Sequence, residues 1–222
     1  MILEAENIHK TFRGPTPFQV LKGVSLQVNR GESVAIMGRS GEGKSTLLSI
    51  LGTLDEPDQG NLKIGGLPAS SSLLNEIRSK NVGFIFQSFH LMQDFTVLEN
   101  ILMPAKIARV PCGKGSEAYN RALSLIERVG LGDHTHQLAK LLSGGEKQRV
   151  AIARALCNDP DIIMADEPSG NLDLANAQSI HDLLITLVKE EGKSLILVTH
   201  SPELARMCDR VYVLQEGKLL MA

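Results

Sequence analysis

The chain has 222 residues, of which 43% are hydrophobic and 22% charged, and its formal net charge is −2 at pH 7. This length suffices for one large α/β domain with a substantial core. A chain so close to neutrality has no overall attraction to nucleic acid or to an anionic membrane, so a dedicated nucleic-acid binder is disfavoured.

The N-terminus is acidic within four residues, and no apolar stretch approaches the ~18 residues that a membrane span requires. We therefore expect no signal peptide and no direct insertion into lipid, so a membrane process would need a separate membrane polypeptide. The three cysteines, Cys112, Cys157 and Cys208, have no C-x-x-C spacing. This favours free thiols in a reducing compartment.

Alternation of apolar and polar residues predicts two half-buried strands near the N-terminus, over residues 2–8 and 24–28. Between them, the cluster Arg13-Gly14-Pro15-Thr16-Pro17 predicts a turn. A short apolar run predicts a buried strand over residues 34–37. A hairpin strand is expected over residues 61–64, where two glycines end it.

Residues 38–45 read G-R-S-G-E-G-K-S and match the phosphate-binding pattern G-x-x-x-x-G-K-[ST]. They lie between a strand and a helix expected over residues 45–51, a geometry in which backbone N–H groups converge on nucleotide phosphates. Lys44 supplies positive charge to the β- and γ-phosphates, and the Ser45 hydroxyl can ligate Mg²⁺. We therefore expect the chain to bind a nucleoside triphosphate. The residues assigned to this site are Gly38, Arg39, Ser40, Gly41, Glu42, Gly43, Lys44, Ser45 and Thr46.

Further along the chain, strands and helices are expected to alternate. The expected strands cover residues 82–87, 161–166, 194–199 and 210–214, the last followed by a turn at Glu216-Gly217. The expected helices cover residues 97–107, 116–129, 146–157, 174–189 and 202–207, with a flexible break at 113–115 and a glycine cap at Gly130. This alternation predicts a mainly parallel sheet covered on both faces.

The strand expected over residues 161–166 ends in two acids, Asp166 and Glu167. An NTPase needs an acid that holds Mg²⁺ and a base that aligns water, so we assign Asp166 to the metal and Glu167 to the base. An acidic strand end that caps a following helix is an equally good interpretation of these two residues alone. The nearby phosphate loop favours the first interpretation.

A second anion site is indicated at Ser143, Gly144, Gly145 and Glu146. Ser143 is a suitable N-cap, and the two glycines leave bare N–H groups at the positive end of the helix dipole. One nucleotide rarely needs two phosphate sites. A simple capped helix is therefore the alternative.

Residues 142–146 match the signature of the ATP-binding-cassette (ABC) ATPases, and the other motifs of that family follow in order. Gln87 ends a strand as the Q-loop glutamine does, residues 169–173 resemble the D-loop, and His200 follows a strand as the switch histidine does. The resemblance spans nearly the whole chain. The fold it implies is the P-loop NTPase ABC ATPase fold, with a mainly parallel core sheet, an N-terminal antiparallel β part and a helical signature subdomain.

The resemblance implies one ABC ATPase domain over residues 1–222. Its two lobes would be a RecA-like core, residues 1–90 and 158–222, and a helical subdomain, residues 91–157.

The same resemblance implies a homodimer that encloses two ATP molecules with Mg²⁺, each ATP shared between one copy's phosphate loop and the other copy's Ser143–Glu146. Gln87 would contact Mg²⁺ and the attacking water, His200 would hydrogen-bond the γ-phosphate, and Asp173 would couple the two sites. Phe12 lies where the family has an adenine-stacking aromatic, although a core phenylalanine remains the alternative. The implied catalytic residues are Lys44, Gln87, Glu167 and His200, and the implied metal ligands are Ser45, Gln87 and Asp166.

Departures from the family pattern are small. Glu42 places an acid in the phosphate loop, where we expect it to point outward, although it could weaken nucleotide affinity. Lys147 and Ser169, where arginine and threonine are common, are expected to be neutral. The chain is therefore expected to be a competent ATPase.

Residues 84–92, 96–101, 165–173 and 176–180 resemble the lipoprotein-releasing and macrolide-exporter cassettes of bacteria. This implies two copies that drive a separate pair of integral membrane permease subunits at the cytoplasmic face of the inner membrane, with lipoprotein release as the leading interpretation. Macrolide efflux or cell division remains an alternative, and an ABC ATPase acting on nucleic acid is disfavoured. Residues 88–104 would form either a groove for a permease helix or plain core.

Overall fold

The computed structural model describes residues 1–14, 16–70 and 72–222, apart from the side chain of Ala175. Its central sheet has six strands in the order β10-β9-β3-β8-β7-β6. Their bounds are β3 (Ser33–Met37), β6 (Val82–Ile85), β7 (Ile162–Asp166), β8 (Ser194–Val198), β9 (Arg210–Gln215) and β10 (Lys218–Met221). All pairs are parallel except β9–β10, which confirms the predicted mainly parallel core.

A second, four-stranded sheet is antiparallel and has the order β2-β1-β4-β5. Its strands are β1 (Leu3–Phe12), β2 (Phe18–Val28), β4 (Gln59–Ile64) and β5 (Leu67–Pro68). The predicted N-terminal antiparallel part is therefore confirmed, with strands longer than expected. The turn predicted at residues 13–17 includes Pro15, which lies outside the described residues.

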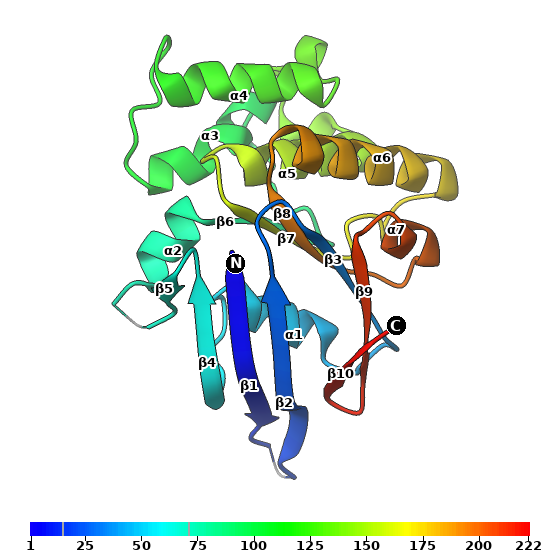
Figure 1. Ribbon diagram of the computed structural model, residues 1–222. Coiled ribbons are helices and arrows are strands. Elements are labelled where there is room, and N and C mark those ends of the chain that lie inside the picture. The colour runs from blue at the N-terminus through cyan, green and yellow to red at the C-terminus, as the bar shows by residue number, and fades with distance from the viewer. Residues whose placement is uncertain (15, 71) are drawn as a thin grey trace.

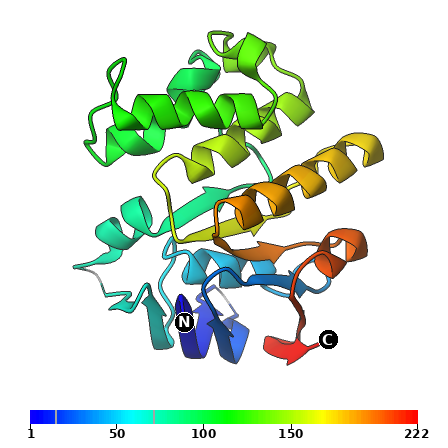
Figure 2. The same ribbon diagram turned by 45° about the horizontal axis from the view of Figure 1, so that its top comes forward.

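Seven α-helices surround these sheets in the described part of the chain (Figure 1). They are α1 (Lys44–Leu51), α2 (Leu74–Lys80), α3 (Val97–Ile107), α4 (Glu117–Arg128), α5 (Gly144–Leu156), α6 (Leu174–Glu190) and α7 (Pro202–Arg206); two short 3₁₀ turns cover Gly132–His134 and Ala139–Leu141. The green helices α3 and α4 lie farthest from the N-terminal sheet in both views (Figures 1 and 2). None of the helices described is both long and apolar enough to cross a bilayer.

The central sheet separates two hydrophobic cores because side chains alternate between its faces. On β8, Leu195 and Leu197 pack into the core shared with α3–α6, whereas Ile196 and Val198 pack into the core shared with α1 and the four-stranded sheet. A strand buried on both faces reads as a continuous apolar run. This is why β8 could be recognised from its sequence.

Helix α2 and strand β10 were not predicted, and neither were the two-residue strand β5 and the two 3₁₀ turns. Helix α2 is short and buries only Ile77 in the core, so its sequence carries little apolar periodicity. Strand β10 follows the turn at Glu216 and Gly217, whose φ values of 51° and 79° make the tight connection of an antiparallel hairpin. The turn itself was predicted correctly, but the returning strand was not.

Candidate functional site

The phosphate loop connects β3 to α1 and lies close to neighbouring backbone. A Cβ on Gly38 would lie 2.6 Å from the carbonyl oxygen of Leu214, and one on Gly43, whose φ is 95°, would lie 2.3 Å from Val20. Real Cβ atoms essentially never lie within 3.0 Å of another heavy atom, so both contacts would be clashes. These two positions therefore require glycine for the loop to keep this path.

Lys44 folds back over its own loop. Its Nζ donates to the carbonyl oxygens of Gly38 at 2.9 Å and Arg39 at 3.0 Å, and the residue is 6% exposed. These two carbonyl oxygens partly compensate the free-energy cost of burying the Lys44 ammonium group. An arriving phosphate would offer Lys44 a full negative charge in their place.

Ser45 and Asp166, separated by 121 positions in the sequence, meet at the carboxyl edge of the central sheet. The Ser45 hydroxyl donates to Asp166 Oδ1 at 3.1 Å. These hard oxygen donors suit Mg²⁺, which is usually held by one or two protein groups, phosphate oxygens and water. Burial raises the pKa of Asp166, while the Ser45 hydrogen bond and the Lys44 charge oppose that shift. The donor set therefore fits the magnesium site expected from the sequence.

Glu167 and His200 form a second pair at the same edge. His200 Nε2 lies 3.0 Å from Glu167 Oε1, and the His200 backbone N–H donates to Glu167 Oε2 at 3.1 Å. Burial raises the pKa of Glu167, and the His200 hydrogen bond and charge act against that shift. A carboxylate with a raised pKa is a better acceptor for a proton from water.

Gln87 lies beside these acids but interacts with the loop that follows them. The Asn171 side chain donates to the carbonyl oxygen of Gln87 at 2.9 Å, and a Cβ on Gly170 would lie 3.0 Å from Gln87 Nε2. The Q-loop and D-loop segments expected from the sequence are therefore in contact.

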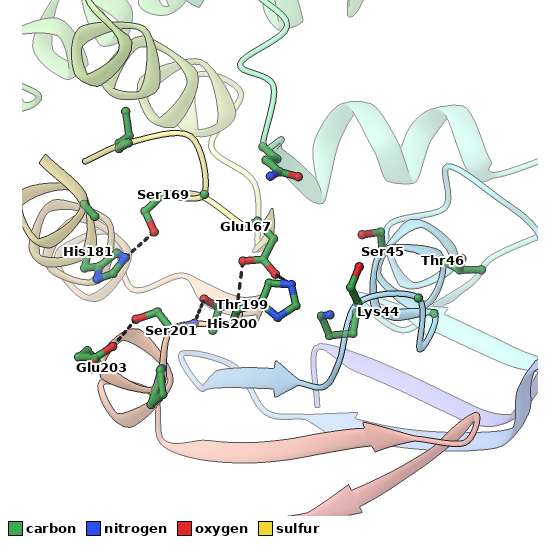
Figure 3. Close-up of a pocket in the computed structure, with 18 of the residues that line it drawn as sticks. Lys44, Ser45, Thr46, Glu167, Ser169, His181, Thr199, His200, Ser201 and Glu203 are labelled. Carbon is green, nitrogen blue, oxygen red and sulfur yellow. Dashed lines mark hydrogen bonds and ion pairs between the residues drawn. The ribbon is translucent and has the colours of Figure 1, made fainter. Parts of the chain in front are cut away.

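One cavity of about 1000 Å³ collects most of the predicted site residues (Figure 3). Those that line it are Phe12, Ser40, Gly41, Gly43, Lys44, Ser45, Thr46, Gln87, Glu167 and His200. Residues that sequence reasoning did not assign to it include Phe18, Val20, Ser169, His181, Thr199, Ser201 and Glu203. This volume is large enough for a nucleotide.

Phe12 and Phe18 are cross-strand partners at the ends of β1 and β2. They are 49% and 63% exposed, and both line the cavity. The core interpretation of Phe12 is therefore wrong. Phe18 was missed because it follows the turn cluster, where no strand was expected.

The predicted signature residues lie outside this cavity. Ser143 and Gly144 are exposed, a Cβ on Gly144 would lie 3.4 Å from Leu172, and one on Gly145 would lie 3.4 Å from Asn176. The predicted N-cap is confirmed: Glu146 N–H bonds to the Ser143 hydroxyl, and the Glu146 carboxylate accepts from Ser143 N–H at 2.7 Å. In a single chain, this helix start therefore faces outward beside the D-loop.

Asp173 likewise is not among the cavity-lining residues described. It is the N-cap of α6, where its carboxylate accepts from the Asn176 backbone N–H at 2.9 Å. The side chain of Glu42 points away from the cavity, as expected. Its carboxylate accepts a hydrogen bond from the Glu216 backbone N–H at 2.7 Å. It therefore tethers the phosphate loop to the β9–β10 turn.

A second hollow of about 1050 Å³ lies on another face, bordered by α2, β6, α3 and α5. We call it the α3 groove; its lining includes Arg78, Phe84, Phe86, His90, Met103, Pro104, Ile107, Arg109 and Arg154. The segment 88–104 divides between the two interpretations given above: Val97, Leu98, Ile101 and Leu102 are core, whereas His90, Met103 and Pro104 line the groove.

Comparison with known proteins gives consistent results. The family described as "ABC transporter" matches residues 21–170. A lipoprotein-releasing system ATP-binding protein LolD from Protochlamydia amoebophila is 55% identical, covering 99% of this chain and 96% of its own. LolD from Pseudomonas fluorescens is 46% identical over 99% of this chain and 97% of its own.

Two solved structures have the same fold. The ATP-binding cassette MJ0796, in a dimeric post-hydrolysis state with ADP and Pi, superposes with a TM-score of 0.88 at 38% identity, covering 98% of this chain and 96% of its own. The cassette cbiO1 from Clostridium perfringens gives 0.85 at 29% identity, covering 99% of this chain and 86% of its own.

Proposed function

The chain belongs to the ABC transporter family and is an ATP-hydrolysing subunit; on this premise we propose that it drives the release of lipoproteins from the inner membrane. The observation that carries the proposal is the 55% identity, over 99% of the chain, with a lipoprotein-releasing ATP-binding protein. The subunit would act at the cytoplasmic face of that membrane, bound to a LolC/LolE-like pair of integral permease subunits.

We assign the chemical step to Glu167. Its carboxylate takes a proton from a water molecule as the water oxygen attacks the γ-phosphorus, and the bond from that phosphorus to its bridging oxygen breaks to leave ADP and inorganic phosphate. The contact with His200 orients the base before ATP arrives. Bound ATP would draw the His200 imidazole to the γ-phosphate.

We assign the remaining phosphate and metal contacts to the loop and the strand edge. Lys44 would exchange the carbonyl oxygens of Gly38 and Arg39 for the β- and γ-phosphates. Ser45, Asp166 and Gln87 would hold Mg²⁺, which when bound neutralises charge that develops on the phosphates. The meeting of Ser45 with Asp166 supports this assignment.

We propose that two copies share each ATP. The start of α5 is exposed at Ser143 and Gly144 and carries the positive end of a helix dipole, yet it lies outside the cavity of its own chain. A second copy, placed head to tail, would bring this start to the γ-phosphate. The dimeric state of MJ0796 supports such an arrangement.

The α3 groove is the surface that we assign to the permease. Its apolar members, Phe84, Phe86, Met103 and Ile107, would receive the apolar face of a short helix. Phe84 and Phe86 stack with ring centroids 4.5 Å apart, so two adjacent aromatic rings line the groove.

Reconstitution in proteoliposomes tests the proposal. With the LolC/LolE-like permease pair and an acylated lipoprotein in the bilayer, ATP should move the lipoprotein to a soluble carrier. The variant Glu167→Gln, which retains the binding residues, should move none. Release that does not depend on ATP, or a complex that exports a macrolide but leaves the lipoprotein in place, would reject lipoprotein release.

A further inference from the structure

A largely buried histidine contributes to the wall of the nucleotide cavity. His181, on α6, is 4% exposed, and its Nε2 lies 2.6 Å from the hydroxyl oxygen of Ser169 (Figure 3). Ser169 comes two residues after Glu167. The pair therefore joins the interior of α6 to the segment that carries the proposed base.

The environment of His181 favours the neutral imidazole. Burial lowers its pKa, while the charges of Asp182 on the same helix and Glu203 on α7 act in the opposite direction. The second ring nitrogen, Nδ1, is buried and has no hydrogen-bond partner among the described residues. A buried N–H without an acceptor is costlier than a bare lone pair. The favoured tautomer therefore carries its proton on Nε2, which donates to Ser169.

The segment that receives this bond is a tight turn. The Gly170 N–H donates to the carbonyl oxygen of Glu167 at 3.0 Å, so Ser169 occupies the third position of a four-residue turn. Glu167 itself has a φ of 44°, in the left-handed region that non-glycine residues seldom adopt. Such a conformation persists only where the surrounding contacts hold it.

The same turn continues into the D-loop. The Leu172 N–H donates to the carbonyl oxygen of Ser169 at 3.1 Å, and the Asn171 side chain donates to the carbonyl oxygen of Gln87. One hydroxyl therefore anchors a segment that carries the base, touches Gln87 and ends at the start of α6.

We propose that His181 is a positioning residue for ATP hydrolysis: its hydrogen bond to Ser169 fixes the turn that holds Glu167 in its strained conformation. His181 touches neither phosphate nor water in this role. It sets where the Glu167 carboxylate lies, and a displacement of about 1 Å at a reacting group can cost ~100-fold in rate. The inference rests on the assignment of Glu167 as the base.

A double-mutant cycle tests it. His181→Leu and Ser169→Ala should each lower kcat about ten-fold and leave KM for ATP within about two-fold, because the phosphate contacts remain. The double variant should be no slower than either single variant, since both remove the same bond. His181→Gln, which can offer an amide N–H to Ser169, should recover part of kcat. Thr186→Ala, an exposed change on the same helix, should match the wild type.

Thermal unfolding separates positioning from stability. Leucine in place of a buried imidazole with an unpaired nitrogen should not lower the melting temperature, although it lowers kcat. If His181→Leu does not fold, Ser169→Ala and Ser169→Thr carry the test, because Ser169 is only partly buried. Rate losses that multiply in the double variant, or unchanged kcat in Ser169→Ala, would overturn the proposal. Glu167→Gln tests the base independently: if it retains full turnover, the base assignment fails instead.

Discussion

Glu167 is unusual in both its backbone conformation and its side-chain environment. It combines a left-handed backbone, a largely buried carboxylate and a close contact with the His200 imidazole. The sequence predicted its role from its place after an apolar run, next to Asp166. Neither the backbone conformation nor the contact with His200 could be predicted, because both depend on parts of the chain that meet only in the folded state.

The raised pKa of Glu167 predicts a pH-dependent stability difference. Because burial raises the pKa in the folded chain, ionisation opposes folding, and this penalty is present above the folded pKa and vanishes below the unfolded one. Glu167→Gln should therefore raise the melting temperature of the nucleotide-free protein at pH 7. The gain should shrink as pH falls towards the ordinary glutamate pKa of about 4.3. An increase in melting temperature that becomes larger as the pH falls would contradict the predicted direction.

The two aromatic residues at the ends of β1 and β2 predict a base-specific loss of affinity. Stacking on a base is worth roughly 1–3 kcal/mol, so Phe12→Ala should weaken ATP binding about 5- to 150-fold. Inorganic tripolyphosphate, which has no base, should bind as before. Calorimetry with both probes makes the comparison, and Leu220→Ala on β10 is the control. Equal losses for both probes would indicate damage to the phosphate loop instead.

At the scale of elements, prediction succeeded where local chemistry and periodicity agree. The structure gives α3 the bounds expected from its sequence, Val97–Ile107, because Thr96 and Glu99 form a capping box at its start. Prediction failed for α2, which buries one side chain, and for β10, which lies at an edge and is largely exposed. Strand β10 has only four residues and no apolar-polar alternation, so it leaves no strand pattern in the sequence.

The two capping boxes offer a matched pair of variants. Ser143→Ala and Thr96→Ala each remove an N-cap side chain, and each should cost about 1 kcal/mol of stability in urea denaturation. Only Ser143→Ala should also weaken ATP-dependent dimerisation, because only that helix start is assigned to the partner's phosphate. Equal effects of both variants on dimerisation would reduce Ser143 to a structural cap.

The α3 groove belongs to the whole molecule, because elements distant in the sequence build it. Ile107 is 73% exposed at its border, so Ile107→Glu should prevent co-purification with the permease pair while isolated ATP-dependent dimerisation is unchanged. Val110→Glu, a similar change at an exposed residue that does not line the groove, is the control. Permease binding that survives Ile107→Glu would place the docking surface elsewhere.

The sequence predicted only some of the functional surfaces of the whole molecule. The phosphate-loop and strand-end residues of the nucleotide cavity were identified from motifs because phosphate chemistry demands specific residue types, whereas neighbours such as Phe18, His181 and Glu203 were not. The α3 groove was left undecided, since the residues of segment 88–104 divide between core and surface by their place on α3. The start of α5 lies outside the cavity, so in the proposed arrangement a second copy would complete the site.

The sharing of ATP between two copies is most directly tested by light scattering. In the Glu167→Gln background, ATP should convert monomers into dimers, and adding Ser143→Arg should keep the protein monomeric although it still binds ATP. Dimers that form normally with arginine at position 143 would contradict the account.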